Sequence, residues 1–359
     1  MTGTLTPGNV RGPASRRRFL RYALGGVAVV AAAGAAGFEL VDHGVLPGKS
    51  ELDQLDGGCD VPAPDLAPYA APGPQYSGAF YSTARQRAVG YTIGYPPGHG
   101  PGHRLPLVIA LHGFGGNHTD ALSGITPSQA VALKSGGAPL PPMALVTADG
   151  GGGYWNPHPG DNPQAMLTDE LIPRCQRQGL GAGRRGIGVL GISMGGYGAI
   201  LLAEKYPHLI GAVAAISPAI WTSYAQAQSA NPGAYASAAD FAAGDAVTHA
   251  AALAEIPVRV ATGFDDPFYP GVQALARALP KNPGGSPAEV FFGGGCHTGS
   301  FFNAQEPPSL AFLARHLTKG LCNVNLPPAG PVDFPLAPRL RPLYGGRCPG
   351  PHLLRPGQP

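Results

Sequence analysis

Short apolar runs alternate with helical stretches through the middle of the chain. Helical patterns cover Ala165–Gln178, Gly195–Tyr206, Gly271–Leu279 and Ser309–Leu317. Runs that are apolar throughout, rather than at every second position, favour strands buried on both faces of a parallel sheet. The alternation therefore predicts one α/β domain. The apolar runs are Leu107–Leu111, Met143–Thr147, Ile187–Gly191, Ala212–Ser217, Val258–Thr262 and Glu289–Phe292.

Two segments depart from this rhythm. Tyr91–Tyr95 alternates more than the other runs and follows Phe80–Tyr81, which predicts an antiparallel pair at the edge of the sheet. Residues 219–250 are rich in Ala and Ser and separate two predicted strands. We expect this insertion to lie over the carboxyl edge of the sheet as a small cap.

The N-terminal segment has the pattern of an export signal. The basic run Ser15–Arg21 leads directly into an apolar stretch at 22–36, shorter than the roughly 20 residues that a spanning helix needs. This order, with paired arginines before Phe-Leu, resembles a twin-arginine signal. We expect residues 1–36 to be such a signal, cleaved or retained, or alternatively a single membrane anchor.

Composition divides the rest of the chain. Residues 37–79 are rich in Pro and Gly and predict a linker, whereas 319–359 form a Pro-rich tail without a helical or alternating period. The predicted domain lies between them, at 80–318. A hydrophobic content of 44% supports a folded body, and a charged fraction of 13% excludes a coiled coil.

The formal net charge of +3 comes from one end of the chain. Residues 1–36 contain five arginines and no acid, so the remainder carries a net charge of −2. A slightly acidic body has no electrostatic footprint for nucleic acid, and we expect no nucleic-acid partner.

The chain has five cysteines, whose pairing depends on whether the protein lies inside or outside the cytoplasm. Outside the cytoplasm they would tend to pair, and an odd number leaves at least one free or bonded to another chain. The sequence does not choose among the possible pairings. The cysteines are Cys59, Cys175, Cys296, Cys322 and Cys348.

The strongest chemical motif is Gly-Ile-Ser-Met-Gly-Gly at 191–196. It follows an apolar run and precedes a helical pattern, the strand–turn–helix context of a nucleophile elbow. Such a turn lifts the Ser193 hydroxyl off the sheet and leaves no room for side chains two residues on either side. The motif predicts that Ser193 is a catalytic nucleophile.

A serine nucleophile needs a base and an acid that orients the base, which follow in this order along the chain in this kind of fold. Asp265 and Asp266 come directly after the run Val258–Thr262, and either could be the acid. His297 follows a run of glycines after the last predicted strand, in a loop that could reach across to Ser193.

The loop after Leu107–Leu111 has the sequence His-Gly-Phe-Gly-Gly. Acyl transfer needs two backbone N–H donors for the oxyanion, and we expect them from Phe114 in this loop and from Met194 after the nucleophile. We expect His112 to shape the loop. Tyr154 and Trp155 follow the next strand and are candidates to line the substrate pocket. This chemistry needs no cofactor and no metal, and we expect neither.

Five segments in this order resemble the esterase D-like group of α/β-hydrolases, which includes S-formylglutathione hydrolases and antigen 85 mycolyltransferases. The resemblance covers about residues 80–318. It implies the α/β-hydrolase fold, a mostly parallel central sheet with helices on both faces, and it selects Asp266 over Asp265 as the acid. The segments are residues 111–120, 148–156, 191–199, 263–269 and 295–297.

With its leader, the chain resembles an exported, actinobacterial-type serine esterase that works through a Ser193–His297–Asp266 triad and an acyl-enzyme. Two other functions stay open, namely acyl transfer to an envelope lipid or sugar and non-catalytic binding outside the cell. We expect a small-molecule or lipid ester as substrate and the twin-arginine machinery as export partner. The expected location is extracellular or in the cell envelope, with peripheral contact to it.

Overall fold

The computed structural model describes residues 59, 61–181, 185–280 and 288–317. All of them belong to Cys59–Pro359, one of the two units into which the chain divides. The predicted signal at 1–36, most of the predicted linker and the tail at 319–359 lie outside the described residues.

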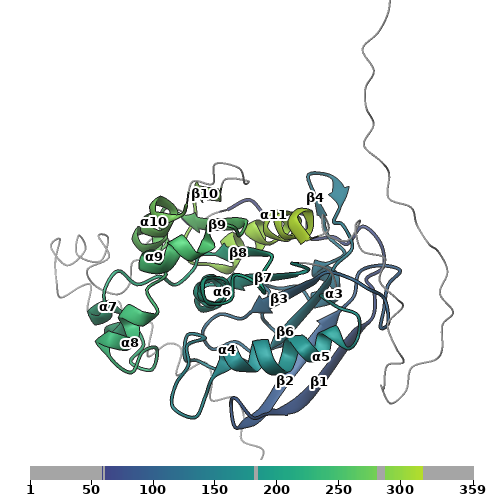
Figure 1. Ribbon diagram of the computed structural model, residues 1–359. Helices are drawn as coiled ribbons and strands as arrows, with labels where there is room; N and C mark the ends of the chain where they lie inside the picture. Colours follow the sequence, from purple (N-terminus) through teal and green to yellow (C-terminus); the bar gives the residue numbers. More distant parts are fainter. Residues whose placement is uncertain (1–58, 60, 182–184, 281–287, 318–359) are drawn as a thin grey trace, which may run out of the picture. The chain divides into compact units, whose positions relative to one another are not determined.

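An eight-stranded sheet forms the centre of the domain (Figure 1). The first two strands pair antiparallel at one edge, β2 pairs antiparallel with β6, and the remaining six strands are parallel. The structure therefore confirms the mostly parallel sheet and the antiparallel edge pair. In spatial order the strands are β1 (Gln75–Ser82), β2 (Arg87–Gly94), β6 (Ala144–Ala148), β3 (Leu107–Leu111), β7 (Ile187–Ile192), β8 (Ala212–Ile216), β9 (Val258–Gly263) and β10 (Glu289–Gly293).

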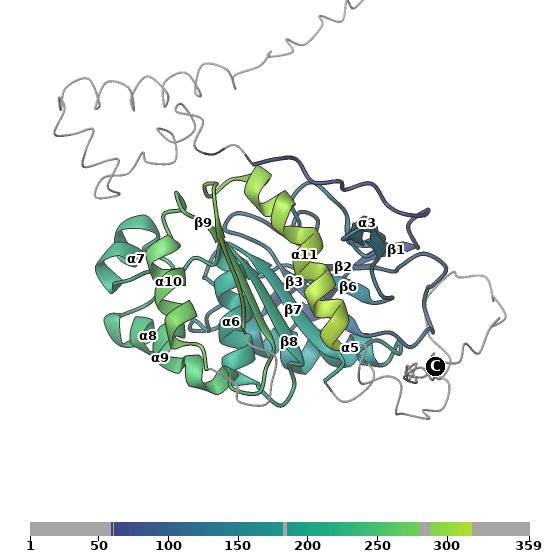
Figure 2. The same ribbon diagram turned by 90° about the horizontal axis from the view of Figure 1, so that it is seen from above.

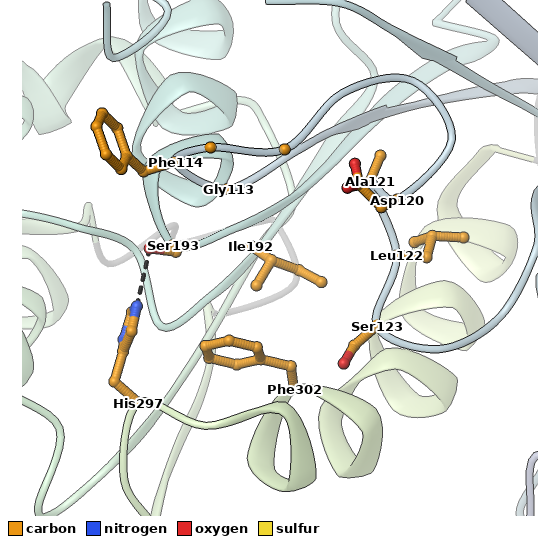
Figure 3. A pocket seen from close by; sticks show the side chains of 12 residues that line it. Gly113, Phe114, Asp120, Ala121, Leu122, Ser123, Ile192, Ser193, His297 and Phe302 are labelled. Carbon is orange, nitrogen blue, oxygen red and sulfur yellow. Dashed lines mark hydrogen bonds between the residues drawn. The ribbon is translucent and has the colours of Figure 1, made fainter. Parts of the chain in front are cut away.

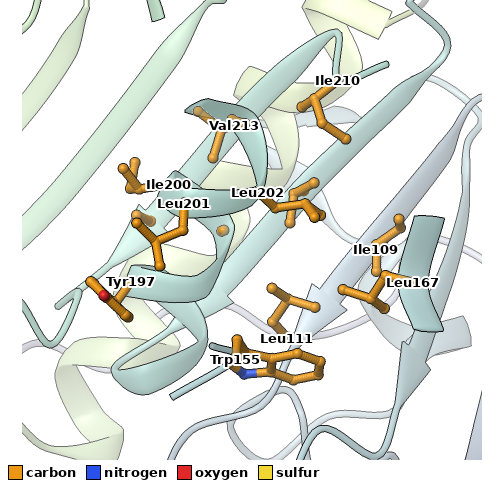
Figure 4. Packing of buried hydrophobic residues seen from close by; sticks show 14 of the residues in the cluster. Ile109, Leu111, Trp155, Leu167, Tyr197, Ile200, Leu201, Leu202, Ile210 and Val213 are labelled. Carbon is orange, nitrogen blue, oxygen red and sulfur yellow. The ribbon is translucent and has the colours of Figure 1, made fainter. Parts of the chain in front are cut away.

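Each face of the sheet has its own core because side chains alternate along a strand. In β3, Leu107, Ile109 and Leu111 pack into one cluster with residues of α6 (Figure 4), whereas Val108 and Ala110 pack into another with residues of α11. Continuous apolar strands are therefore explained by helices on both faces.

Helices cover both faces, and α11 lies over β8 and β7 (Figure 2). A small pair of strands, β4 (Lys134–Ser135) and β5 (Ala138–Pro139), lies outside the main sheet. The helices are α3 (Pro127–Ala130), α4 (Pro163–Ala165), the π-helical η1 (Met166–Leu171), α5 (Ile172–Gln176), α6 (Met194–Lys205), α7 (Tyr224–Ala230), α8 (Ala238–Ala243), α9 (Ala246–His249), the 3-10 helix η2 (Ala250–Leu253), α10 (Tyr269–Ala278) and α11 (Gly299–Leu317).

Two boundaries differ from the prediction. The sheet begins at Gln75, so the folded body starts before residue 80 and includes part of the expected linker. Helix α11 begins at Gly299, ten residues before the predicted start at Ser309. Pro307 and Pro308 hide this helix in the sequence, because proline lacks the N–H that a helix interior needs. The structure nevertheless continues the helix through both prolines, with Phe301 buried before them and Leu310 and Phe312 buried after them.

The insertion at 219–250 folds into α7, α8 and α9 with short connections. It packs beside α6 through aromatic contacts. Tyr235 lies 6.2 Å from Tyr197 and 6.1 Å from Tyr154 between ring centroids. The Tyr197 hydroxyl donates a hydrogen bond of 2.7 Å to the Gly244 carbonyl.

One disulfide joins the beginning and the end of the described domain, between Cys59 and Cys296. Cys175 is a buried free thiol. Two further cysteines, Cys322 and Cys348, lie outside the described residues.

Helix α11 contains a buried carboxyl group that ties it to the loop after β3. Glu306 is fully buried, and its Oε1 accepts a hydrogen bond of 2.6 Å from the Ser123 N–H. Its Oε2 has no hydrogen-bond partner among the described residues. Burial raises the pKa of Glu306 to about 8, because the charged form is poorly solvated there.

We expect this group to make the domain less stable as pH rises. An acid whose pKa is higher in the folded state binds its proton more tightly there, so its contribution is largest below the ordinary value of 4.5 and falls until about pH 8. The loss is on the order of a few kcal/mol. Urea unfolding at pH 5 and pH 9 measures it.

The matched variant is Glu306→Gln, which keeps an acceptor for Ser123 but cannot ionise. It should lose less free energy of unfolding than the wild type between the two pH values. A residual slope is expected from Glu204, whose pKa burial also raises to about 8. Equal slopes for Glu306→Gln and the wild type would contradict the assignment.

Candidate active site

Ser193 sits at a sharp turn between β7 and α6, with φ 57° and ψ −120°. This left-handed backbone is uncommon for a residue with a side chain. The turn requires glycine on both sides of the serine. A Cβ on Gly191 would lie 2.0 Å from the Gly195 carbonyl oxygen, and a Cβ on Gly195 would lie 1.9 Å from the Leu111 carbonyl oxygen. The strand–turn–helix geometry is the one expected of a nucleophile elbow.

The structure brings Ser193, His297 and Asp266 together. His297 Nε2 lies 2.8 Å from Ser193 Oγ, and His297 Nδ1 lies 2.9 Å from Asp266 Oδ2 (Figure 3 shows the first contact). Asp266, rather than Asp265, is the carboxylate bonded to the imidazole. Asp266 is buried, and its Oδ1 accepts a hydrogen bond of 2.8 Å from the Phe268 N–H. A buried acceptor fixed by the backbone can hold the imidazole in one tautomer and orientation.

Two aromatic rings flank His297. The ring of Phe268 lies 5.1 Å away and the ring of Phe302 lies 5.0 Å away, both roughly edge to face. These contacts come from the start of α10 and the start of α11, so the imidazole is confined by elements that are themselves packed on the sheet.

The loop after β3 places a second backbone segment beside the serine. A Cβ on Gly113 would lie 3.6 Å from the Ser193 Cβ. The turn closes by a hydrogen bond of 3.1 Å from Gly116 N–H to Gly113 O, with Gly115 at φ +79°. Phe114 lies within this turn, and Met194 is the first residue of α6, where N–H groups have no acceptor within the helix. Met194 directly follows Ser193, and Phe114 directly follows Gly113, so the two residues expected to supply the oxyanion hole adjoin this contact.

His112 fixes this loop through two hydrogen bonds of its ring, and neither involves Ser193. Its Nδ1–H donates to the Gly113 carbonyl at 2.7 Å, and its Nε2 accepts from the Gly150 N–H at 2.8 Å. This pattern needs the neutral imidazole, and burial lowers the pKa of His112 in agreement with it. His112 therefore shapes the loop, as predicted.

A cavity of about 520 Å³ opens beside Ser193 and His297. Ile192 and Phe302 form its apolar part, between the serine and the segment 120–123 (Figure 3). No residue of the insertion at 219–250 is among those that line it. The lining residues are Gly113, Phe114, Gly115, Gly116, Asp120, Ala121, Leu122, Ser123, Ile192, Ser193, His297 and Phe302.

The structure corrects the pocket assignment of Tyr154 and Trp155. Both are buried and neither lines this cavity. Consecutive positive φ angles of 55° and 56° turn the chain back into the core at this point. Trp155 packs against His112 at 5.1 Å between ring centroids and donates its Nε1–H to the His112 carbonyl at 3.2 Å. Trp155 therefore supports the loop that carries His112, whereas Tyr154 packs against Tyr197 and Tyr235.

The sequence did not reveal Phe302 or the segment 120–123 as pocket residues. Phe302 follows His297 by five residues, and the stretch 120–123 follows the glycine-rich loop after β3. Closeness in the sequence to these two motifs was the one feature that could have indicated a place in the pocket. Within the described part of the chain, no group of three or more His, Cys, Asp or Glu side chains is arranged to hold a metal ion.

The family model described as putative esterase matches residues 82–278, which is more than half of the chain. No curated protein matches the sequence. The matched range includes Ser193 and Asp266 and ends before His297.

Several solved structures share the fold. An S-formylglutathione hydrolase from Agrobacterium tumefaciens is 18% identical with a TM-score of 0.54, over 69% of this chain and 97% of that one. A feruloyl esterase module from Clostridium thermocellum, complexed with sinapinate, is 19% identical with a TM-score of 0.54, over 72% and 95%. A fluorophosphonate-binding serine hydrolase from Staphylococcus aureus is 15% identical with a TM-score of 0.53, over 68% and 99%. The fold is that of the α/β-hydrolases.

The two neighbouring aspartates should differ sharply in their effect on serine reactivity. Asp266→Asn presents an N–H to His297 and favours the tautomer whose Nε2 already carries a proton, so it cannot accept the Ser193 proton. We expect labelling of Ser193 by a fluorophosphonate to slow by about 100-fold or more. Asp265→Asn is the matched control and should label at the wild-type rate. The reverse ranking would move the acid role to Asp265.

Proposed function

The chain belongs to the putative esterase family, and we propose that it hydrolyses carboxylic esters with Ser193 as nucleophile, His297 as base and Asp266 as the orienting acid. The observation that carries this assignment is the continuous chain of hydrogen bonds from Ser193 Oγ through His297 to Asp266. It supports a reaction through an acyl-enzyme.

In the first half of the reaction, Ser193 Oγ attacks the ester carbonyl while His297 Nε2 takes the hydroxyl proton. The carbonyl oxygen becomes an oxyanion that can accept hydrogen bonds from the N–H groups of Phe114 and Met194. When the carbon–oxygen bond to the alcohol breaks, Nε2 returns the proton to the departing alcohol. The acyl group then remains on Ser193.

In the second half, a water molecule takes the place of the alcohol. His297 Nε2 accepts one proton from the water as its oxygen attacks the acyl carbonyl, and it gives this proton to Ser193 Oγ when the acyl–serine bond breaks. The products are a carboxylic acid and the free serine. Asp266 stabilises the imidazolium that forms in both halves without taking a proton.

The cavity supports an ester of modest size with an apolar part. Its volume is in the range of small-molecule sites, and Ile192, Leu122 and Phe302 supply apolar walls. The residues that line the cavity include one acid, Asp120, and no Lys or Arg. This charge pattern favours neutral esters over anionic ones.

Acyl transfer is a second candidate, because Phe114 is 63% exposed at the mouth of the cavity and offers an apolar surface to an acceptor alcohol. Water and an alcohol can both attack an acyl-enzyme. Incubation with an ester, with and without trehalose or another polyol, separates the two by mass spectrometry of the products. Free acid under both conditions supports hydrolysis, and an acylated polyol supports transfer.

We also propose that the enzyme acts outside the cytoplasm. The twin-arginine pattern before residue 37 and the Cys59–Cys296 disulfide support export, since disulfides persist in oxidising compartments. Within the described residues, no helix has the length and hydropathy to span a membrane.

Replacing Arg16, Arg17 and Arg18 with Lys tests the export route, because it keeps the charge but changes the geometry that the receptor reads. The variant should accumulate inside the cell. Export equal to that of the parent, measured by fractionation, would instead indicate a general secretory signal or an anchor.

Removing the nucleophile tests the hydrolase assignment. We expect Ser193→Ala to reduce kcat for a short-chain p-nitrophenyl ester by about 1000-fold or more, because the oxyanion hole and binding alone retain little catalysis. Ser300→Ala is the matched control, since Ser300 is exposed and lies three residues from His297. It should keep wild-type kcat. A Ser193→Ala variant with more than about a tenth of wild-type kcat would overturn the assignment.

A further inference from the structure

The loop that carries His297 begins with residues whose backbone is conformationally free. It leaves β10 through Gly293, Gly294 and Gly295, and Gly295 has φ +128°, in a region that favours glycine. Glycine loses more backbone freedom on ordering than any other residue. Because these three glycines have no side chains to pack, the loop must be held by other contacts.

Two backbone hydrogen bonds hold one side of the loop. The N–H of Phe264 donates to Gly293 O at 2.8 Å, and the N–H of Asp265 donates to Gly295 O at 3.2 Å. These bonds align the base loop with the loop that carries Asp266. They leave Cys296, the residue directly before His297, to be fixed from elsewhere.

The N-terminal segment supplies that fixation. Cys296 is fully buried and bonded to Cys59, which lies 237 positions earlier in the chain. The same segment packs on the preceding residue, because a Cβ on Gly295 would lie 2.8 Å from Val61 Cγ2. The packing contact therefore falls on Gly295 and the disulfide on Cys296, the two residues directly before His297.

The position of His297 leaves little tolerance. Its two ring nitrogens must each stay within hydrogen-bond distance of a different partner, 2.8 Å on one side and 2.9 Å on the other. A displacement of about 1 Å can cost about 100-fold in rate. Phe268 and Phe302 confine the ring, but neither contact fixes the backbone from which the ring projects.

We propose that Cys59 and Cys296 are positioning residues for His297, so that ester hydrolysis depends on the intact disulfide between them. This inference rests on the proposed function. Opening the bond takes a dithiol reductant. One thiolate attacks a disulfide sulfur to give a mixed disulfide, and the second thiolate displaces the cysteine. The net products are two cysteine thiols and one oxidised reductant, with two electrons and two protons transferred to the protein.

The first experiment compares Cys59→Ala and the double variant Cys59→Ala/Cys296→Ala with the wild type. Activity toward p-nitrophenyl butyrate is measured at a temperature at which circular dichroism shows each variant to be folded. We expect kcat to fall by about 10-fold or more and KM to stay within about twofold, because the cavity walls are unchanged. The rate of fluorophosphonate labelling of Ser193 should fall with kcat.

Two controls separate positioning from general destabilisation. Leu66→Ala loosens the packing of the same N-terminal segment on the core without touching the disulfide. Cys175→Ala removes the buried free thiol. Both should lower the Tm and keep wild-type kcat in the folded protein. Wild-type kcat in folded Cys59→Ala, or an equal loss of kcat in Leu66→Ala, would overturn the proposal.

A second measurement opens the disulfide in the wild type itself. The wild type is treated with dithiothreitol, and alkylation with peptide mass spectrometry establishes when Cys59 and Cys296 are reduced. Activity should fall as this bond opens and return on re-oxidation, whereas folded Cys59→Ala should not respond to the reductant. Full activity with the bond open, or an equal response in Cys59→Ala, would refute the positioning role.

These results are distinguishable from a failure of the proposed function. An active Ser193→Ala enzyme would refute the hydrolase mechanism itself. An inactive Ser193→Ala enzyme together with wild-type kcat in Cys59→Ala would refute only the role of the disulfide.

Discussion

Backbone approaches that are too close for any Cβ hold both halves of the site. Gly195 brings the start of α6 against the end of β3, where a Cβ would lie 1.9 Å from the Leu111 carbonyl oxygen. Gly263 brings the end of β9 against the last loop, where a Cβ would lie 1.9 Å from the Gly295 carbonyl oxygen. The first approach sets the nucleophile, and the second sets the base loop beside the acid loop. The hydrogen bond between serine and histidine depends on both.

The sheet then gives these loops a common edge. The strands β3, β7, β9 and β10 run parallel, so the loops that follow them emerge on the same side. In an open α/β sheet this carboxyl edge is where sites form. Apolar cores on both faces keep the strands in register, and Trp155, which packs against His112, helps to keep the loop after β3 in place. The sheet therefore positions the loops that carry the site residues, and these loops need few contacts with one another.

Much of this arrangement could be predicted from the sequence, because continuous apolar runs and a glycine-flanked serine have few structural alternatives. The choice of Asp266 over Asp265 needed the family resemblance, since both carboxylates follow the same strand. Tyr154 and Trp155 were assigned wrongly to the pocket, because nothing in a glycine-rich loop indicates that the chain turns back into the core. The early start of α11, and with it Phe302, was hidden by two prolines. The pairing of Cys59 with Cys296 joins distant positions and could not be chosen by spacing.

The central claim is that Ser193 carries the acyl group during turnover. A slowly hydrolysed substrate, p-nitrophenyl dimethylcarbamate, tests this most directly, because its carbamoyl-enzyme persists long enough for analysis. Peptide mass spectrometry should locate one carbamoyl group on Ser193, with one p-nitrophenol released per protein molecule. Release of p-nitrophenol with the carbamoyl group on another residue, or with no modified residue, would contradict the account.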